Sequence, residues 1–157
     1  FLHSVTPLIN EDVRVIVCGI GKLPYKLLQR IKIFRNVEFI GSVEDILQFY
    51  EATQAIAIPL QKGSGTRLKA IEAMSFAKPM VSTSKGIEGI ELENQFSCLV
   101  ADSAEEFAHC INRLFEDRDL RIELGTNAYD RFLAQYTWDV IVKNTLIDMN
   151  QQGSSLN

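Results

Sequence analysis

The chain alternates between short continuous apolar runs and longer stretches in which apolar residues recur three or four positions apart. Short apolar runs are typical of buried strands, whereas the longer spacing is typical of helices that bury one face. The apolar runs occupy residues 13–18, 37–41, 55–60, 80–83 and 97–101. Because helical patterns separate these runs, we expect an α/β fold in which a parallel sheet is covered by helices on both faces.

Local signals mark where several of the predicted helices begin. Ser42 with Asp45, and Ser103 with Glu106, have the three-residue spacing of a capping box, and Thr137 is expected to cap the last helix. The apolar positions expected on buried helix faces are Leu2, Val5, Leu8 and Ile9; Leu23, Leu27, Leu28, Ile31 and Phe34; Ile46, Leu47 and Tyr50; Phe107, Cys110, Ile111 and Leu114; Leu120, Leu124, Ala128 and Phe132; and Trp138, Ile141, Val142, Leu146 and Met149.

Composition narrows the class of protein. The 157 residues contain 16 Lys and Arg against 20 Asp and Glu, so the basic surface of a general nucleic-acid binder is not expected. No run of about 18 apolar residues is present, and we expect no membrane-spanning segment in this chain. Cys18, Cys98 and Cys110 lie in apolar surroundings without a metal-binding spacing, which predicts reduced thiols in a cytoplasmic protein. His3 and His109 are interpreted as surface residues.

The length predicts one domain with a short tail. We expect residues 1–150 to form the domain and residues 151–157, which are polar, to be disordered. The chain begins at Phe1, inside a helical pattern, and we therefore interpret it as a piece of a longer polypeptide.

The segment after the third apolar run has the pattern of an anion site. Gly63 and Gly65 allow a ligand to approach the backbone closely, and Arg67 and Lys69 lie in the first helical turn, where the helix dipole favours a bound phosphate. An ordinary turn with solvated cations is the alternative. Right-handed crossovers between parallel strands place the strand-to-helix loops at one edge of the sheet. The loops expected to line this crevice are residues 19–21, 41–43, 62–66 and 84–89.

The glycine loops do not match the common nucleotide motifs. The dinucleotide fingerprint G-x-G-x-x-G would need glycine where Pro24 stands, and the Walker loop fails because Leu68 follows Gly63 by five positions. Hydrolase elbows and metal-binding signatures are also missing from the sequence. We therefore expect neither NAD binding, nor ATP hydrolysis of the Walker type, nor a metal site.

Seven separated segments share their order and spacing with one known family. They are VEFIGSV (37–43), PL (59–60), GSGTRLK (63–69), EAM (72–74), KPMVST (78–83), GIEG (86–89) and YTW (136–138). Together they resemble the C-terminal domain of retaining, family 4 (group 1) glycosyltransferases of the GT-B fold.

The resemblance implies a Rossmann-like domain that binds a nucleoside-diphosphate sugar as substrate and needs no cofactor. It implies hexosyl transfer with retention, as in polysaccharide biosynthesis, with the acceptor bound by an N-terminal domain of the same polypeptide. The family's first C-terminal strand, followed by an Arg and a Lys that neutralise the leaving diphosphate, would precede Phe1. We therefore expect this chain to lack that strand and to be inactive alone.

The resemblance also assigns donor-binding residues. Glu72 matches the second acid of the family's Glu-x7-Glu pattern, which holds the ribose hydroxyls. Gly65, Thr66, Arg67 and Leu68 match the loop and helix start whose backbone amides hold the distal phosphate, and Gly63, Ser64 and Lys69 are the neighbouring residues expected to bind the donor. A loop beside the nucleobase is matched by Gly41, Ser42 and Val43.

One departure from the family pattern leaves the function open. Ser64 stands where the first acid of the pattern would fall, so no catalytic residue is assigned, and Arg67 and Lys69 are the cations that could compensate at the diphosphate. A catalytically degenerate nucleotide-binding domain or a sugar-nucleotide epimerase of similar architecture is therefore an alternative. A protein-interaction domain whose glycine loop is only a turn is a third.

Overall fold

The computed structural model describes residues 1–19, 24–63 and 65–154 of the chain. Its strands within these residues are all parallel and form two groups. In the first group β1 (Val15–Cys18) pairs with β2 (Val37–Gly41), and in the second β4 (Met80–Ser82) lies between β3 (Ile56–Ile58) and β5 (Leu99–Val100). The predicted α/β class with parallel strands is confirmed. The sheet is divided into two groups, because no described strand joins β1 to β3.

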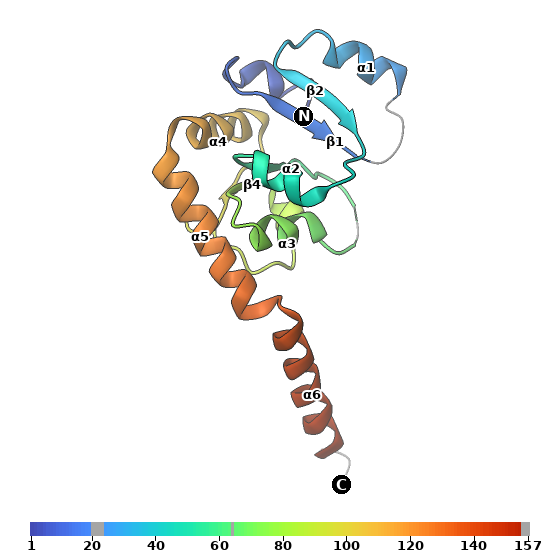
Figure 1. Ribbon diagram of the computed structural model, residues 1–157, viewed down its shortest axis with the longest axis vertical. Helices are drawn as coiled ribbons and strands as arrows, with labels where there is room; N and C mark the ends of the chain where they lie inside the picture. Colours follow the sequence, from blue (N-terminus) through green and yellow to red (C-terminus); the bar gives the residue numbers. More distant parts are fainter. Residues whose placement is uncertain (20–23, 64, 155–157) are drawn as a thin grey trace.

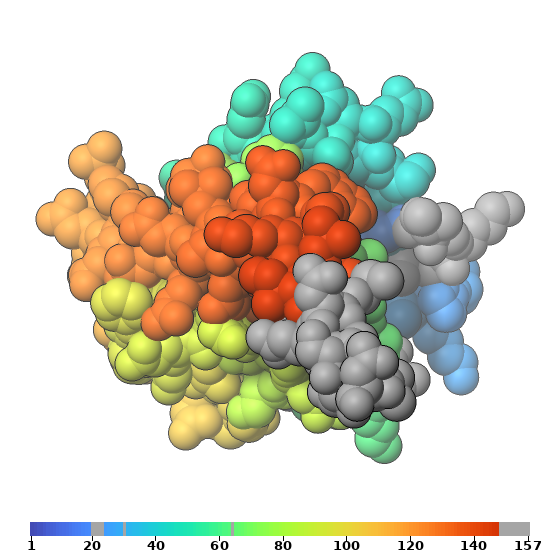
Figure 2. Space-filling model, turned by 90° about the horizontal axis from the view of Figure 1, so that it is seen from below, coloured from blue at the N-terminus to red at the C-terminus, as the bar shows by residue number. Residues whose placement is uncertain are grey.

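Helices connect the strands and cover them (Figure 1). Their bounds are α1 (Tyr25–Ile31), α2 (Ile46–Ala52), α3 (Leu68–Ser75), α4 (Ala104–Glu116), α5 (Arg118–Gln135) and α6 (Trp138–Ser154), with short 3-10 helices η1 (Thr6–Leu8) and η2 (Ser84–Ile87). Seen from below, the orange surface of α5 lies between the teal surface around α2 and the yellow-green surface of the loop after η2 (Figure 2). Helix α3 packs against β3, and helix α4 packs against β4, as the apolar runs of the second strand group predict.

The beginning of the chain is not the predicted amphipathic helix. Residues 2–9 form turns and η1, which has a proline in its first turn. Val5 and Ile9 are nevertheless buried, and the ring of Phe1 packs edge-on against Phe107 with 5.9 Å between the ring centroids. The apolar spacing thus identified two core residues, whereas their conformation is set by contacts with α4.

The helix starts were predicted with mixed success. The Ser103–Glu106 capping box of α4 is confirmed. The Ser42–Asp45 box is wrong because Asp45 is itself the N-cap of α2, and its Oδ1 accepts hydrogen bonds from the following backbone N–H groups. The helix therefore starts one turn later than the box requires, and Ile46 and Leu47 in its first turn are exposed rather than buried.

The last helix differs most from its predicted environment. Trp138 is 81% exposed, and the other described members of its apolar stripe are exposed as well. Figure 1 shows the reason: α6 extends away from the body of the molecule beyond the end of α5. It continues to Ser154, past the start of the tail predicted at residue 151, and residues 155–157 lie outside the described part.

The core is formed mainly by the second strand group and helices α3, α4 and α5. Met74 and Met80 are fully buried, as are Leu99 and Leu124. Burial raises the pKa of the Cys98 thiol to about 12, and the pKa of Cys110 is also raised, so both thiols are unreactive core residues at neutral pH. No helix in the described residues combines the length and hydropathy that a membrane span requires.

Candidate functional site

The carboxyl ends of the strands carry the predicted loops. The amide of Gly19, after β1, donates to the carbonyl of Gly41, at the end of β2, over 2.8 Å. Gly41 has a φ of 74°, a conformation that favours glycine. Ser42 is exposed and Val43 half-buried beside it. Residues 20–21 of the first predicted loop lie outside the described residues.

Hydroxyl groups fix the loops that follow the second strand group. Thr83 Oγ1 donates to the Leu60 carbonyl over 2.5 Å and accepts from the Gly86 amide. Ser84 donates to the Asp102 carboxylate through both its hydroxyl and its amide, which lowers the pKa of Asp102 below its ordinary value. The ends of β3, β4 and β5 are thereby linked to one another.

Close packing requires a glycine at one position of these loops, Gly86 in η2. A Cβ at Gly86 would lie 2.3 Å from Ser82 Oγ and 3.0 Å from the Ile58 carbonyl oxygen. Gly63 and Gly65 differ, because their φ angles of 137° and 125°, rather than crowding, favour glycine. The backbone of the loop before α3 is therefore exposed while the turn at η2 is packed against the sheet.

The predicted cations separate at the start of α3. Lys69 is exposed, as is Leu68. Arg67 is only 8% exposed, and its guanidinium contacts three main-chain carbonyls and the carboxylate of Glu88. The structure thus leaves Lys69 in the position expected from the sequence and directs the Arg67 side chain into the protein. Ser64 lies outside the described residues.

Glu72 is oriented by a residue that the sequence analysis assigned only to the core. The Tyr50 hydroxyl donates to Glu72 Oε2 over 3.2 Å, and its ring stacks on Phe76 with 4.5 Å between centroids. Burial, then the neighbouring Glu72 and Cys18, raise the pKa of Tyr50, so the phenol remains a donor at neutral pH. The sequence could have indicated this contact, because Tyr50 was predicted on a buried helix face and a buried hydroxyl requires a hydrogen-bond partner.

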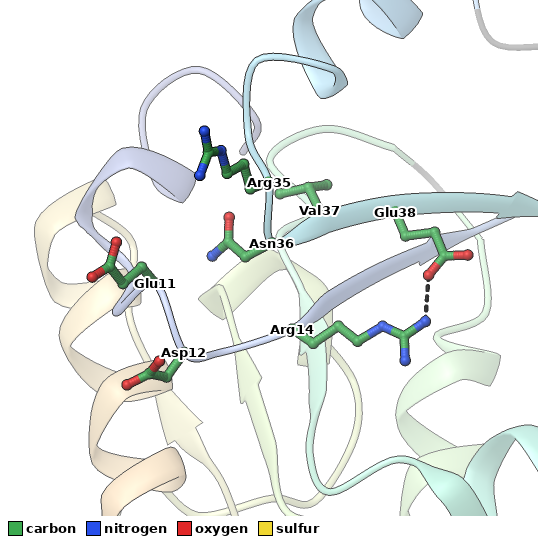
Figure 3. A pocket seen from close by; sticks show the side chains of 7 residues that line it. All are labelled: Glu11, Asp12, Arg14, Arg35, Asn36, Val37 and Glu38. Atoms are coloured by element: carbon green, nitrogen blue, oxygen red, sulfur yellow. Dashed lines mark hydrogen bonds and ion pairs between the residues drawn. The ribbon is translucent and has the colours of Figure 1, made fainter.

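Two surface hollows lie elsewhere. A hollow of about 290 Å³ at the amino ends of β1 and β2 is lined by Glu11, Asp12, Arg14, Arg35, Asn36, Val37 and Glu38 (Figure 3). Arg14 and Glu38 form an exposed ion pair there. A second hollow of about 300 Å³ lies between α2 and the start of α5. Neither hollow contains a residue predicted to bind the donor.

The remaining titratable residues that the structure describes form no cluster of metal-binding side chains. Within residues 1–19, 24–63 and 65–154, no three His, Cys, Asp or Glu side chains gather closely enough to hold a metal ion. His3 and His109 are exposed, in agreement with their interpretation as surface residues. Exposed backbone at residues 63 and 65–66, the half-buried Glu72 and the exposed Lys69 lie in the loop before α3 and in its first turns.

The chain belongs to the family of group 1 glycosyl transferases, because residues 1–117 match the family's sequence model. It is 30% identical over 97 residues to a D-inositol 3-phosphate glycosyltransferase of Corynebacterium kroppenstedtii, covering 60% of this chain and 21% of that protein. It is 28% identical over 122 residues to an uncharacterized 44.6 kDa protein in the cps region of Klebsiella pneumoniae, covering 71% and 31%. The chain thus spans a fifth to a third of these relatives.

Solved structures confirm the fold. The Anabaena protein Alr3699/HepE, in complex with UDP and glucose, matches with a TM-score of 0.77 at 22% identity over 96% of this chain and 44% of that one. The C-terminal domain of a group 1 glycosyl transferase (LpcC) from Francisella tularensis matches with a TM-score of 0.65 at 24% identity, covering 72% and 62%. The resemblance and the predicted fold of a C-terminal GT-B domain are therefore confirmed.

Proposed function

We propose that this chain is the donor-binding part of a retaining glycosyltransferase and that its donor is a UDP-sugar. Family membership supports the reaction class. The solved complexes of Anabaena Alr3699/HepE with UDP-glucose and with UDP and glucose support uridine as the base. The acceptor then binds to another domain of the same polypeptide, and this chain alone is inactive.

The observation that carries the proposal is the position of Glu72. Its carboxylate lies one turn into α3 and accepts a hydrogen bond from Tyr50, and the residues just before the helix, 65–66, are exposed. A carboxylate can accept hydrogen bonds from both ribose hydroxyls, while the free N–H groups at a helix start suit the adjoining diphosphate. Gly41, Ser42 and Val43 are the proposed contacts of the base.

The protein's main contribution to the reaction is to stabilise the departing diphosphate. Negative charge grows on the diphosphate as the bond to the sugar breaks, and preorganised N–H groups stabilise that charge without rearranging. Each charge-assisted hydrogen bond is worth roughly 1.5–3 kcal/mol. Lys69, exposed in the first turn of α3, adds a positive charge at the same place. We place the reaction in the cytoplasm, which is consistent with the three free cysteines.

A nucleotide-binding domain without transferase activity is the second candidate. Ser64 favours it, because the family pattern has a carboxylate at that position. Both candidates require nucleotide binding by Glu72 and the α3 loop. They differ in turnover by the full-length protein, which the first requires and the second excludes.

The test is nucleotide binding by the chain, measured by isothermal titration calorimetry with UDP, GDP and ADP. We expect UDP to bind most tightly and the Glu72→Gln variant to bind it about tenfold more weakly, because a neutral amide is a poorer acceptor for two hydroxyls. Glu123→Gln, on the exposed face of α5, is the matched control and should bind UDP like the wild type. The proposal is wrong if no nucleoside diphosphate binds, or if Glu72→Gln changes nothing.

A further inference from the structure

The start of α3 contains a buried arginine whose hydrogen bonds join two loops. Arg67 Nε donates to the carbonyl of Lys85 in η2 over 2.8 Å. Arg67 Nη1 donates to the carbonyl of Gly65 over 2.8 Å, and Nη2 to that of Gly63 over 3.3 Å. A guanidinium has its donors in a rigid plane, so these bonds fix the position of the glycine loop relative to η2.

Glu88 completes the arrangement. Its Oε2 accepts from Arg67 Nη2 over 3.0 Å and from Lys85 Nζ over 2.5 Å. The hydrogen bond from Lys85, together with the charge of Lys85 and the contact with Arg67, lowers the pKa of Glu88 below its ordinary value. We call the contacts of Arg67 with Gly63, Gly65, Lys85 and Glu88 the Arg67 link.

The far side of the link is anchored to the sheet. The Thr83 side chain caps η2, and Gly86 packs directly against Ser82 and the end of β3. The Arg67 link therefore connects the exposed glycine loop before α3 to η2, which is itself held against β3 and β4. An anion would have to displace Glu88 or a carbonyl group to reach the guanidinium.

The link also determines where one amide points. The described peptide bonds are trans, so the carbonyl of Gly65 and the N–H of Thr66 point in opposite directions from the peptide between them. Because the Gly65 carbonyl is bonded to the guanidinium, the Thr66 N–H is directed away from Arg67. Thr66 is exposed, so this direction leads toward solvent.

We propose that Arg67 is a positioning residue that directs the Thr66 amide at the distal phosphate of the donor and does not itself bind the phosphate. This inference rests on the proposed function, because the distal phosphate belongs to the proposed nucleotide. It reassigns Arg67 from the diphosphate, where the sequence analysis placed it, to the protein's own loops. Lys69 keeps its predicted place as an exposed cation.

Two conservative variants test the proposal. Arg67→Lys keeps the charge but removes the planar set of donors, and Glu88→Gln keeps the shape but removes the charge. The matched controls are Arg14→Lys and Glu38→Gln, which make the same changes in an exposed ion pair at the other end of the strands. Circular dichroism establishes that each variant is folded, and Glu88→Gln, altered at an exposed side chain, decides the test if Arg67→Lys does not fold.

The first measurement is amide hydrogen exchange of the nucleotide-free chain. We expect both test variants to exchange faster than the wild type at residues 65–66 and 85–88, and both controls to match the wild type. Unchanged exchange in the test variants would overturn the link as the element that holds the loop. This measurement needs no ligand, so it decides the link even if the proposed function fails.

The second measurement compares the affinities for UDP and UMP. We expect each test variant to weaken UDP binding about tenfold and UMP binding much less, since UMP has no distal phosphate. Tighter UDP binding by Glu88→Gln would overturn the proposal, because it would mean that the freed guanidinium binds the phosphate directly. If the wild-type chain binds neither nucleotide, the proposed function fails and with it the role of the link in binding.

Discussion

The two groups of strands are held in different ways. All three residues of β4 are buried, and hydroxyl groups link the loops at the ends of β3, β4 and β5. In the pair β1 and β2, Val37 is the one buried residue among the nine that the two strands contain, and Ile16 is 38% exposed. The groups that need the most accurate placement, at the proposed diphosphate, lie beside the well-packed strands. The proposed base-contacting loop, residues 41–43, lies on the less enclosed pair.

The largest expected effect comes from a core truncation in the well-packed group. Met80→Ala removes a fully buried side chain and should lower the free energy of unfolding by about 2–5 kcal/mol. Ile16→Ala, in the exposed pair, should cost no more than about 1 kcal/mol. Urea unfolding followed by circular dichroism gives both values, and equal losses would contradict the difference between the groups.

A smaller loss is expected where the backbone approaches itself. Gly86→Ala places a Cβ 2.3 Å from Ser82 Oγ and 3.0 Å from the Ile58 carbonyl oxygen, and should destabilise the fold by about 1–3 kcal/mol. Gly19→Ala is the control, because no atom lies within 4 Å of a Cβ built there. Urea unfolding applies again. If the two variants are equally stable, η2 is not held against β3 as closely as the structure has it.

Loss of the Tyr50 hydroxyl should affect binding more than stability. Tyr50→Phe keeps the ring stacked on Phe76 but leaves Glu72 without its donor, and UDP should bind about fivefold more weakly, or about 1 kcal/mol. The loss should vanish with 2′,3′-dideoxyuridine diphosphate, which has no ribose hydroxyls for Glu72 to hold. Tyr25→Phe, at an exposed residue of α1, is the control. An equal loss of affinity for both ligands would contradict the assignment of Glu72 to the ribose hydroxyls.

The smallest expected effect is a dependence on pH. The pKa of Glu88 is lowered in the folded chain, so the stability that Glu88 contributes is present above its ordinary pKa of 4.5 and is lost as the pH falls through the lowered folded value. The wild type should therefore melt slightly higher than Glu88→Gln at about pH 6, and the difference should shrink as the pH is lowered below 4.5. Differential scanning calorimetry gives the melting temperatures. If the difference between the two melting temperatures grows on acidification, the charged form of Glu88 does not stabilise the fold.

Errors in the sequence analysis concentrate where burial depends on distant partners. The apolar spacing of α6 is regular, yet Trp138 is exposed, because no other part of the described chain covers that face of the helix. The spacing in α2 likewise selected Ile46 and Leu47, although Tyr50 is the buried member. A helical period shows that a helix can bury one face, but it does not show whether anything packs against that face.

What the sequence alone determined is local: the order of strands and helices, the Ser103–Glu106 cap, the glycines of the loop before α3, and the family that these motifs resemble. The elements, the cap and the glycines depend on residues that are neighbours in the chain, and the resemblance depends on the order and spacing of separated motifs, so the sequence was sufficient for each. Tertiary structure decided that the strands form two groups, that Arg67 is buried against Glu88, and that Tyr50 holds Glu72. These contacts join residues 21 and 22 positions apart, and only the packed chain sets their distances.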